Sequence, residues 1–355
     1  MIPAELYYSI YLIVLFILTV FQMRAKRPPT AKEKAGGSFL LCLFMIWFVG
    51  GRPVNIVFGD MLGYAIEYVF NKPEWTGFDW DTRNVLFVNM FNFMAGGIEA
   101  HFSTYFQMMA VLFYLPLFFV FRKLHPNHSL LAYVIYLSAF TAFSGATNGF
   151  KSAAAVSLFL VAFAYRDKLW ISIPFILLSL GFHHSMRIVL LAYIAVFFVR
   201  NPKIYFLWWV FCLLMAVGHV TTFQDYFASM ESDDRVAKYI TSDVGGKGGF
   251  RIDFIIYSFM PILMGYYMKF KCKWENKVYD MFLYAYLATN GLWLLCMYAN
   301  FTNRFASLSW FMYPIVLTYP CFAVADKKHP VVKNRNLIIM AHLGFTMGMH
   351  FVLGR

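Results

Sequence analysis

The sequence has few charged residues, and this scarcity excludes a water-soluble protein. Lys, Arg, Asp and Glu make up 14% of its 355 residues, whereas 61% are hydrophobic and the mean hydropathy is +0.60. A soluble domain is typically about half apolar and a quarter charged. The composition therefore excludes a soluble enzyme, a disordered chain and a nucleic-acid-binding protein, and it indicates an all-α, polytopic integral membrane protein.

The sequence also lacks the motifs of nucleotide-binding and metal-dependent enzymes. It contains no Walker loop, no GxGxxG after a strand, no HExxH and no CxxC pair. Four of its five cysteines lie in apolar segments, where a thiol usually packs as a small core residue. We therefore expect no metal and no cofactor. A reaction catalysed here must draw its energy from an activated substrate delivered by the membrane.

Long apolar runs predict about twelve transmembrane helices in a single transmembrane domain over residues 1–355. A membrane helix needs about 20 mostly apolar residues, because hydrocarbon cannot satisfy an open backbone. Since the first run is followed by basic residues and not by a cleavage site, we expect it to be a retained helix. The candidate segments are 6–23, 37–51, 102–121, 129–147, 152–165, 169–182, 185–199, 203–222, 252–268, 279–298, 305–325 and 336–353.

The positive charges predict that the N-terminus lies outside. In that orientation the inside connections hold 19 of the 30 Lys and Arg residues, but only five of the 18 Asp and Glu residues. Cytoplasmic connections of membrane proteins are enriched in Lys and Arg. The charge distribution thus agrees with twelve spans without reassigning any segment.

Two outside loops are long enough to carry a function. The first, residues 51–100, contains an aromatic and acidic patch at 74–81 and an apolar, Asn-rich stretch at 84–98 that suits an interfacial helix. The second, residues 224–250, contains a glycine-rich stretch at 245–249. That stretch suits a flexible lid and a plain linker equally well.

Of the basic residues that this topology places outside, five lie at the ends of predicted helices, on the face that is otherwise poor in positive charge. Each adjoins a long apolar stretch, and charges near membrane depth usually face a cavity or a partner. Arginine is well suited to bind phosphate oxygens through two parallel hydrogen bonds. We therefore expect an outward-facing anion site, although each residue taken alone could simply snorkel to the interface. The five are Arg52, Lys151, Arg187, Arg251 and Arg304.

Candidate proton acceptors accompany these cations. His183 and His184 occupy a turn between two short apolar segments, and Asp60 lies in the first outside loop; Glu99 and His101 are further candidates. An imidazole, with an unperturbed pKa of about 6.5, could take a proton from a hydroxyl. The alternative is that the histidines cap helices and that Asp60 neutralises a cation. An anion site, a base and an aromatic loop together suggest a polyprenyl-phosphate donor and a sugar acceptor.

Four motifs, taken in order, resemble the EpsG family of bacterial exopolysaccharide and O-antigen (Wzy-like) polymerases. They are Arg52 with FGDMLGY at 58–64, NGFKSAAA at 148–155, FHHS at 182–185 and NRFA at 303–306. The family pattern has arginine where this sequence has Lys151. A compact ammonium therefore replaces a planar guanidinium that could bind phosphate through two hydrogen bonds. It also has an aromatic residue where this sequence has Met61.

The resemblance implies a GT-C-like polymerase in the bacterial inner (cytoplasmic) membrane, with its active site facing the periplasm or outside. The implied reaction is an inverting glycosyl transfer from a glycan on undecaprenyl diphosphate to a hydroxyl of a lipid-linked repeat unit. The implied partners are undecaprenyl-diphosphate-linked oligosaccharides, membrane lipids, and a chain-length regulator or flippase. No nucleic acid is expected.

The resemblance also implies roles for individual residues. The base is His183, His184 or Asp60, and no metal is required. The acceptor glycan is bound by Trp75 and Trp80. The lipid diphosphate is bound by Arg52, Lys151, Arg187, Arg251 and Arg304, with Tyr64 and Asn303 as further substrate-binding residues.

Three other functions fit part of the sequence. A flippase for lipid-linked glycans would need a cationic cavity open to both faces, whereas these cations gather at the outer ends of spans. A membrane acyltransferase would take its acyl donor from the inside, where the loops are short and basic. A scaffold for polysaccharide assembly would leave the outer cations without a purpose.

Overall fold

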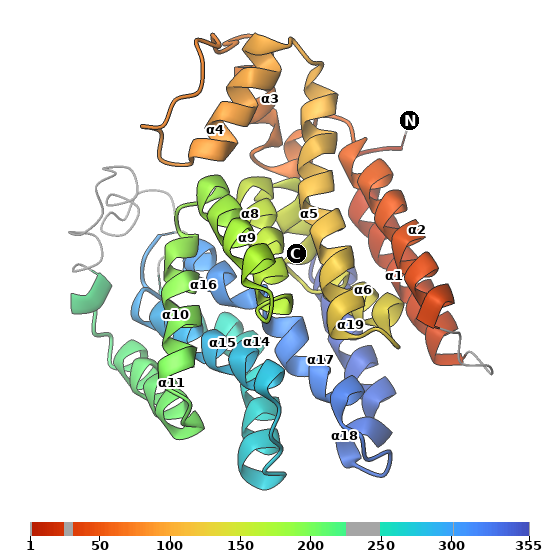
Figure 1. The fold of residues 1–355 in the computed structure, drawn as a ribbon, viewed down its shortest axis with the longest axis vertical. Helices are drawn as coiled ribbons and strands as arrows, with labels where there is room; N and C mark the ends of the chain where they lie inside the picture. Colours follow the sequence, from red (N-terminus) through yellow and green to blue (C-terminus); the bar gives the residue numbers. More distant parts are fainter. Residues whose placement is uncertain (1, 25–30, 225–248, 301, 355) are drawn as a thin grey trace. The chain divides into compact units, whose positions relative to one another are not determined.

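The computed structural model describes residues 2–24, 31–224, 249–300 and 302–354. Helices make up 75% of it, and these residues contain no strand, which confirms the all-α prediction (Figure 1). The glycine-rich stretch of the second loop lies almost wholly outside the described residues. The chain divides into two compact units: unit 1 is Met1–Met186 with Phe322–Arg355, and unit 2 is Arg187–Cys321. The single transmembrane domain stays a prediction.

Unit 1 has its core around α8. Every residue of α8 from Ala153 to Ala164 is buried, and the helix packs against both α5 and α9. A helix that is apolar on all sides is expected inside a helical assembly. The helices of this unit are α1 (Leu6–Arg24), α2 (Ala31–Gly50), η1 (Ile56–Phe58), α3 (Met61–Val69), α4 (Val85–Asn92), η2 (Phe93–Gly97), α5 (Phe102–Leu124), α6 (Ser129–Leu137), α7 (Ala142–Thr147), α8 (Phe150–Ala164), α9 (Leu169–Phe182), α18 (Pro330–Lys333) and α19 (Arg335–Phe351).

Unit 2 has α15 at its centre, packed against α11, α14 and α16. The fully buried Asn290 of α15 accepts a hydrogen bond from Trp209 of α11 and donates to Ser258 of α14 and Ser309 of α16. The helices of this unit are α10 (Met186–Phe198), α11 (Pro202–Val217), α14 (Ile252–Tyr266), η3 (Tyr267–Lys271), α15 (Lys277–Leu295), α16 (Thr302–Trp310) and α17 (Tyr313–Ala323), with the terminal residues of α10 and α17 in unit 1.

The helices agree with a membrane protein, but only some are long enough to span. Within the described part of the chain, Leu6–Arg24, Phe102–Leu124 and Thr302–Ala323 have the length and hydropathy of a crossing, and six further apolar helices are shorter. Each of the twelve candidate segments falls on a helix or on a broken pair of helices. Twelve crossings stay a prediction.

Two candidate segments are interrupted. The run 305–325 is divided between α16 and α17 at Phe311 and Met312. Pro314 explains the break, because it has no N–H to donate to the carbonyl four residues earlier and it is favoured in a first helical turn. The run 129–147 is divided between α6 and α7, where the Ser138 hydroxyl donates to Ile135 O.

Residues 51–100, which were predicted to form the first outside loop, contain more helix than expected. The stretch 84–98 forms α4 and η2, and its interfacial position stays a prediction, whereas α3 was missed. The signal for α3 was present in the sequence, since Met61, Ala65 and Tyr68 recur at helical spacing and are its buried residues.

Candidate functional site

Arg52 is buried, in contrast to the exposed cation that an anion site would present. It follows α2 and is 5% exposed; its Nη1 donates to Val49 O at 2.7 Å and its Nη2 to Thr147 O at 3.0 Å. Burial lowers the pKa of the Arg52 guanidinium to about 10, so it stays charged at neutral pH. Since C-terminal helix carbonyls carry partial negative charge, this cation joins the ends of α2 and α7.

The motif in the first loop meets the motif at the start of α8. The backbone N–H of Asp60 donates to Asn148 Oδ1 at 2.9 Å, while Asp60 itself is exposed. Gly59 has a φ of +63°, and a Cβ there would collide with the Asn148 side-chain amide. A glycine is therefore required for Asn148 to approach this turn.

Lys151 and Tyr64 lie around one aromatic residue of α4. The Lys151 Nζ is 5.3 Å from the centre of the Phe87 ring. The Tyr64 ring packs edge-on against Phe87 and Phe150, with centroids 5.8 and 4.8 Å apart. These contacts join α3, α4 and α8, so Asp60, Tyr64 and Lys151 belong to one region of unit 1.

The histidine pair is attached to the same region through Asn84, a residue that the sequence analysis missed. Asn84 Oδ1, just before α4, accepts from the His184 backbone N–H at 3.0 Å and lies 3.1 Å from His184 Nδ1. The two imidazoles stack with centroids 5.4 Å apart. The Ser185 N–H donates to His183 Nδ1 at 3.3 Å.

These contacts set the tautomers of the two histidines. The Asn84 oxygen is only an acceptor, and the backbone donor fixes which way the amide points, so His184 Nδ1 carries a hydrogen, and in the neutral imidazole the lone pair is on Nε2. His183 is the reverse, because its Nδ1 accepts from a backbone N–H. The two rings of the motif are therefore chemically distinct.

The further acid–base candidates have structural partners. Glu99 forms an ion pair with Lys72 at 2.5 Å, and this hydrogen bond lowers the pKa of the Glu99 carboxyl. His101 begins α5, where its Nδ1 accepts from the Ser103 N–H at 3.3 Å. Glu99 therefore pairs with a charge and His101 caps a helix, so each side chain has a structural role.

The two tryptophans of the first loop have different surroundings. Trp75 is half-buried and packs edge-on against Phe93, with centroids 5.4 Å apart. Trp80 is 78% exposed beside Phe78, with centroids 4.5 Å apart. Both residues belong to the aromatic and acidic patch at 74–81 that the sequence indicates, but only Trp75 and Trp80 of that patch were predicted to bind the acceptor glycan.

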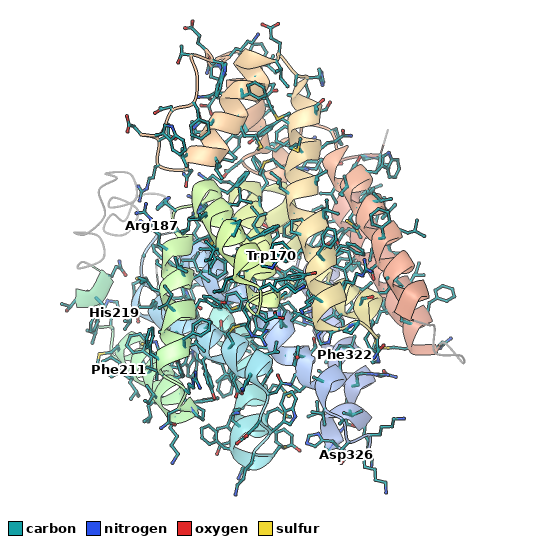
Figure 2. All side chains as sticks on the ribbon, in the orientation of Figure 1. Trp170, Arg187, Phe211, His219, Phe322 and Asp326 are labelled. Carbon is teal, nitrogen blue, oxygen red and sulfur yellow. The ribbon has the colours of Figure 1, made fainter. Side chains whose placement is uncertain are left out.

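The predicted cations of unit 2 all lie in first helical turns or at caps. Arg187 is exposed in the first turn of α10 (Figure 2), and Arg304 is exposed with Asn303 in the first turn of α16. Arg251 caps α14 and makes a two-pronged ion pair with Asp253, at 2.9 and 2.7 Å. Arg251 therefore already holds a carboxylate in the geometry that phosphate would take.

Comparison with known proteins gives one match. A family model for the EpsG family matches residues 38–352, which is nearly the whole chain. No match was found among the curated proteins or the solved structures. The match agrees with the sequence motifs, three of which lie in the region of unit 1 described above. The chain therefore belongs to the EpsG family, a family of Wzy-like polysaccharide polymerases and glycosyltransferase-like membrane proteins.

Proposed function

We propose that this protein polymerises lipid-linked oligosaccharide repeat units at the outer face of the cytoplasmic membrane. The donor is a glycan on undecaprenyl diphosphate, and the acceptor is a sugar hydroxyl of a second lipid-linked unit. The observation that carries the proposal is the attachment of three sequence motifs to one region: Asp60 contacts Asn148, Lys151 contacts α4, and His184 contacts Asn84 at the start of α4. Family membership supports the same chemistry.

His184 is the base in this proposal. Its Nδ1 is held as a donor to Asn84, so the Nε2 lone pair can take the proton of the attacking hydroxyl. The hydroxyl oxygen forms a bond to the anomeric carbon as the bond from that carbon to the diphosphate oxygen breaks, with inversion. The diphosphate leaves as an anion. His183 positions the turn through its bond from Ser185.

The leaving diphosphate needs positive charge. Arg187, Arg251 and Arg304 are assigned to it, with Lys151, because preorganised cations stabilise charge that develops in a transition state. Arg251 must exchange Asp253 for a phosphate oxygen. Arg52 supports the site by joining α2 to α7, next to Asn148.

Alanine at Arg304 tests the proposal. Purified protein in nanodiscs, supplied with lipid-linked repeat units, should form a ladder of longer products, and Arg304→Ala should slow it by about 100-fold or more. Arg200→Ala, which changes an exposed arginine in the connection before α11, is the matched control and should polymerise normally.

The products separate the alternatives. A ladder identifies a polymerase, whereas repeat units that only change leaflet identify a flippase, and transfer of an acyl group identifies an acyltransferase. Unchanged polymer length with Arg304→Ala, at normal protein level, would remove Arg304 from the site.

A further inference from the structure

The first outside loop presents two aromatic rings to its surroundings. Phe78 and Trp80 are 43% and 78% exposed, and their ring centroids are 4.5 Å apart at 54°. Most other exposed large hydrophobic residues of the chain lie on helices, where lipid can cover them. Phe78 and Trp80 instead stand in an irregular segment between α3 and α4, beside exposed carboxylates.

The backbone below these rings is firmly held. Asn89 of α4 is 4% exposed; its Oδ1 accepts from Asp79 N–H at 2.8 Å, and its Nδ2 donates to Asp79 O and to Val85 O, each at 2.7 Å. The backbone N–H and C=O of Asp79, which lies between the two aromatic residues, are thus both hydrogen-bonded to the buried side-chain amide of Asn89. The Asp81 N–H also donates to Asp79 Oδ1 at 2.9 Å. A surface that is ordered before its ligand arrives loses less entropy on binding.

The segment that precedes the two rings, residues 73–75, is also packed against a helix. Gly96 lies against Pro73 O so closely that a Cβ there would collide with it, and Gly97 lies under the Trp75 ring. Residues 73–75 are thus packed onto η2 while Asp79 is bonded to α4. Between the two attachments, Phe78 is 43% exposed and its ring packs beside Trp80.

The charge of this loop is acidic. Residues 73–82 contain Glu74, Asp79 and Asp81, all exposed, and no Lys or Arg, while the half-buried Arg83 follows directly. The nearest preceding cation, Lys72, is paired with Glu99. Carboxylates accept hydrogen bonds from hydroxyl and ammonium groups, and they repel phosphates and other carboxylates.

We propose that Phe78 and Trp80, with the carboxylates of Glu74, Asp79 and Asp81, form a glycan platform that binds the acceptor repeat unit and selects neutral or amino sugars over acidic ones. Aromatic faces bury the apolar face of a sugar ring, and the carboxylates bind its hydroxyls. The inference rests on the proposed function. It also gives Trp75 a structural role, because Trp75 is packed against Phe93.

The glycan platform is close in sequence to the proposed base. Four residues after Trp80, Asn84 holds His184 through its Oδ1. A glycan bound at the rings would therefore be held by the same short segment that orients the imidazole. This link connects acceptor binding to the reacting hydroxyl.

The test measures binding separately from polymerisation. The oligosaccharide is released by mild acid from lipid-linked repeat units and titrated against the full-length protein in nanodiscs, with saturation-transfer NMR as readout. We expect Trp80→Ala and Phe78→Ala to weaken binding at least about tenfold. Trp170→Ala is the matched control, since Trp170 of α9 is 74% exposed, and it should bind as the wild type does.

The preference for neutral or amino sugars over acidic ones is tested by comparing two forms of the oligosaccharide. The same oligosaccharide, oxidised at its primary hydroxyls to carboxylates, should bind the wild type at least about tenfold more weakly than the unoxidised form. Asp81→Asn should reduce that difference. Equal binding of the two forms, or an acidic repeat unit as the natural glycan, would overturn the selection.

The remaining outcomes distinguish this inference from the proposed function. If the wild type binds the oligosaccharide through Trp80 but builds no ladder, the polymerase proposal fails and the glycan platform stands. If Trp80→Ala binds and elongates normally, the platform fails. Quenching of Trp80 fluorescence by brominated lipids in the nanodisc would overturn it as well, because the rings would then lie in the bilayer.

Discussion

At the scale of single residues, the two adjacent imidazoles differ in which nitrogen has the lone pair. His184→Asn keeps a side-chain amide that can donate to Asn84 but removes the base, so the polymerisation rate should fall by about 100-fold or more. His183→Asn keeps an acceptor for the Ser185 N–H and should stay within severalfold of the wild type. Initial rates of ladder formation measure both. A reversed order would identify His183 as the base.

The residues of this region were only partly predictable. Asp60, Lys151 and the histidine pair were identified from their charge or acid–base character and from their positions at the ends of apolar segments, and motifs that resemble a family pattern include them. Asn84 and Asn89 were not, because their roles depend on which backbone groups the loop leaves open, and spacing alone does not show this. Arg52 was identified, but its burial against Val49 O and Thr147 O was not expected.

At the scale of elements, the turn between η1 and α3 determines whether Asn148 can reach Asp60. Gly59→Ala places a Cβ against the Asn148 amide at a positive φ, so it should destabilise the protein by about 1–3 kcal/mol and reduce polymer length. Gly63→Ala is the matched control, because a Cβ there meets nothing within 4 Å and alanine favours the helix by about 0.5–1 kcal/mol.

Thermal unfolding in detergent and polymer length in cells measure these effects. Equal stability and equal polymer length for the two alanine variants would mean that the Asp60–Asn148 contact has no role.

The helices were largely predictable from hydropathy, and their interruptions were not. Apolar runs predicted the helices because a helix that is buried in lipid and a helix that is buried in protein both need mostly apolar residues. The apolar runs could not show that 129–147 would form two helices, because no proline marks the break. At the break, the Ser138 hydroxyl donates a hydrogen bond to Ile135 O. Pro314, by contrast, was a readable signal for the break before α17.

At the scale of the whole molecule, family membership covers both units, but the two units are organised differently. In unit 1, the side chains of Asn84, Asn89 and Asn148 each accept a hydrogen bond from a backbone N–H group, and these bonds hold residues 51–100 in place. Unit 2 instead has a polar network in its core, where Ser258 also accepts from Trp310 Nε1 at 2.8 Å. Buried polar groups of this kind favour one arrangement of helices over others, because alternatives leave them unsatisfied.

Asn290 is the centre of that network, and its replacement tests whether the network fixes α16, which carries Asn303 and Arg304. Asn290→Leu removes the acceptor of Trp209 Nε1, at 2.8 Å, and the donor to Ser309 Oγ, at 2.9 Å. Each buried group left unsatisfied costs about 1–3 kcal/mol, so the unfolding temperature should fall clearly and ladder formation should weaken.

Thr289→Val is the matched control for this change. Thr289 is 2% exposed and adjacent, but its hydroxyl donates only to carbonyls of its own helix, at Ala285 and Tyr286. Such bonds contribute little to helix stability, so this variant should unfold and polymerise nearly as the wild type does. If Asn290→Leu matched Thr289→Val in unfolding temperature and in rate, the network would not determine the position of α16, and the placement of Arg304 would depend on helix packing alone.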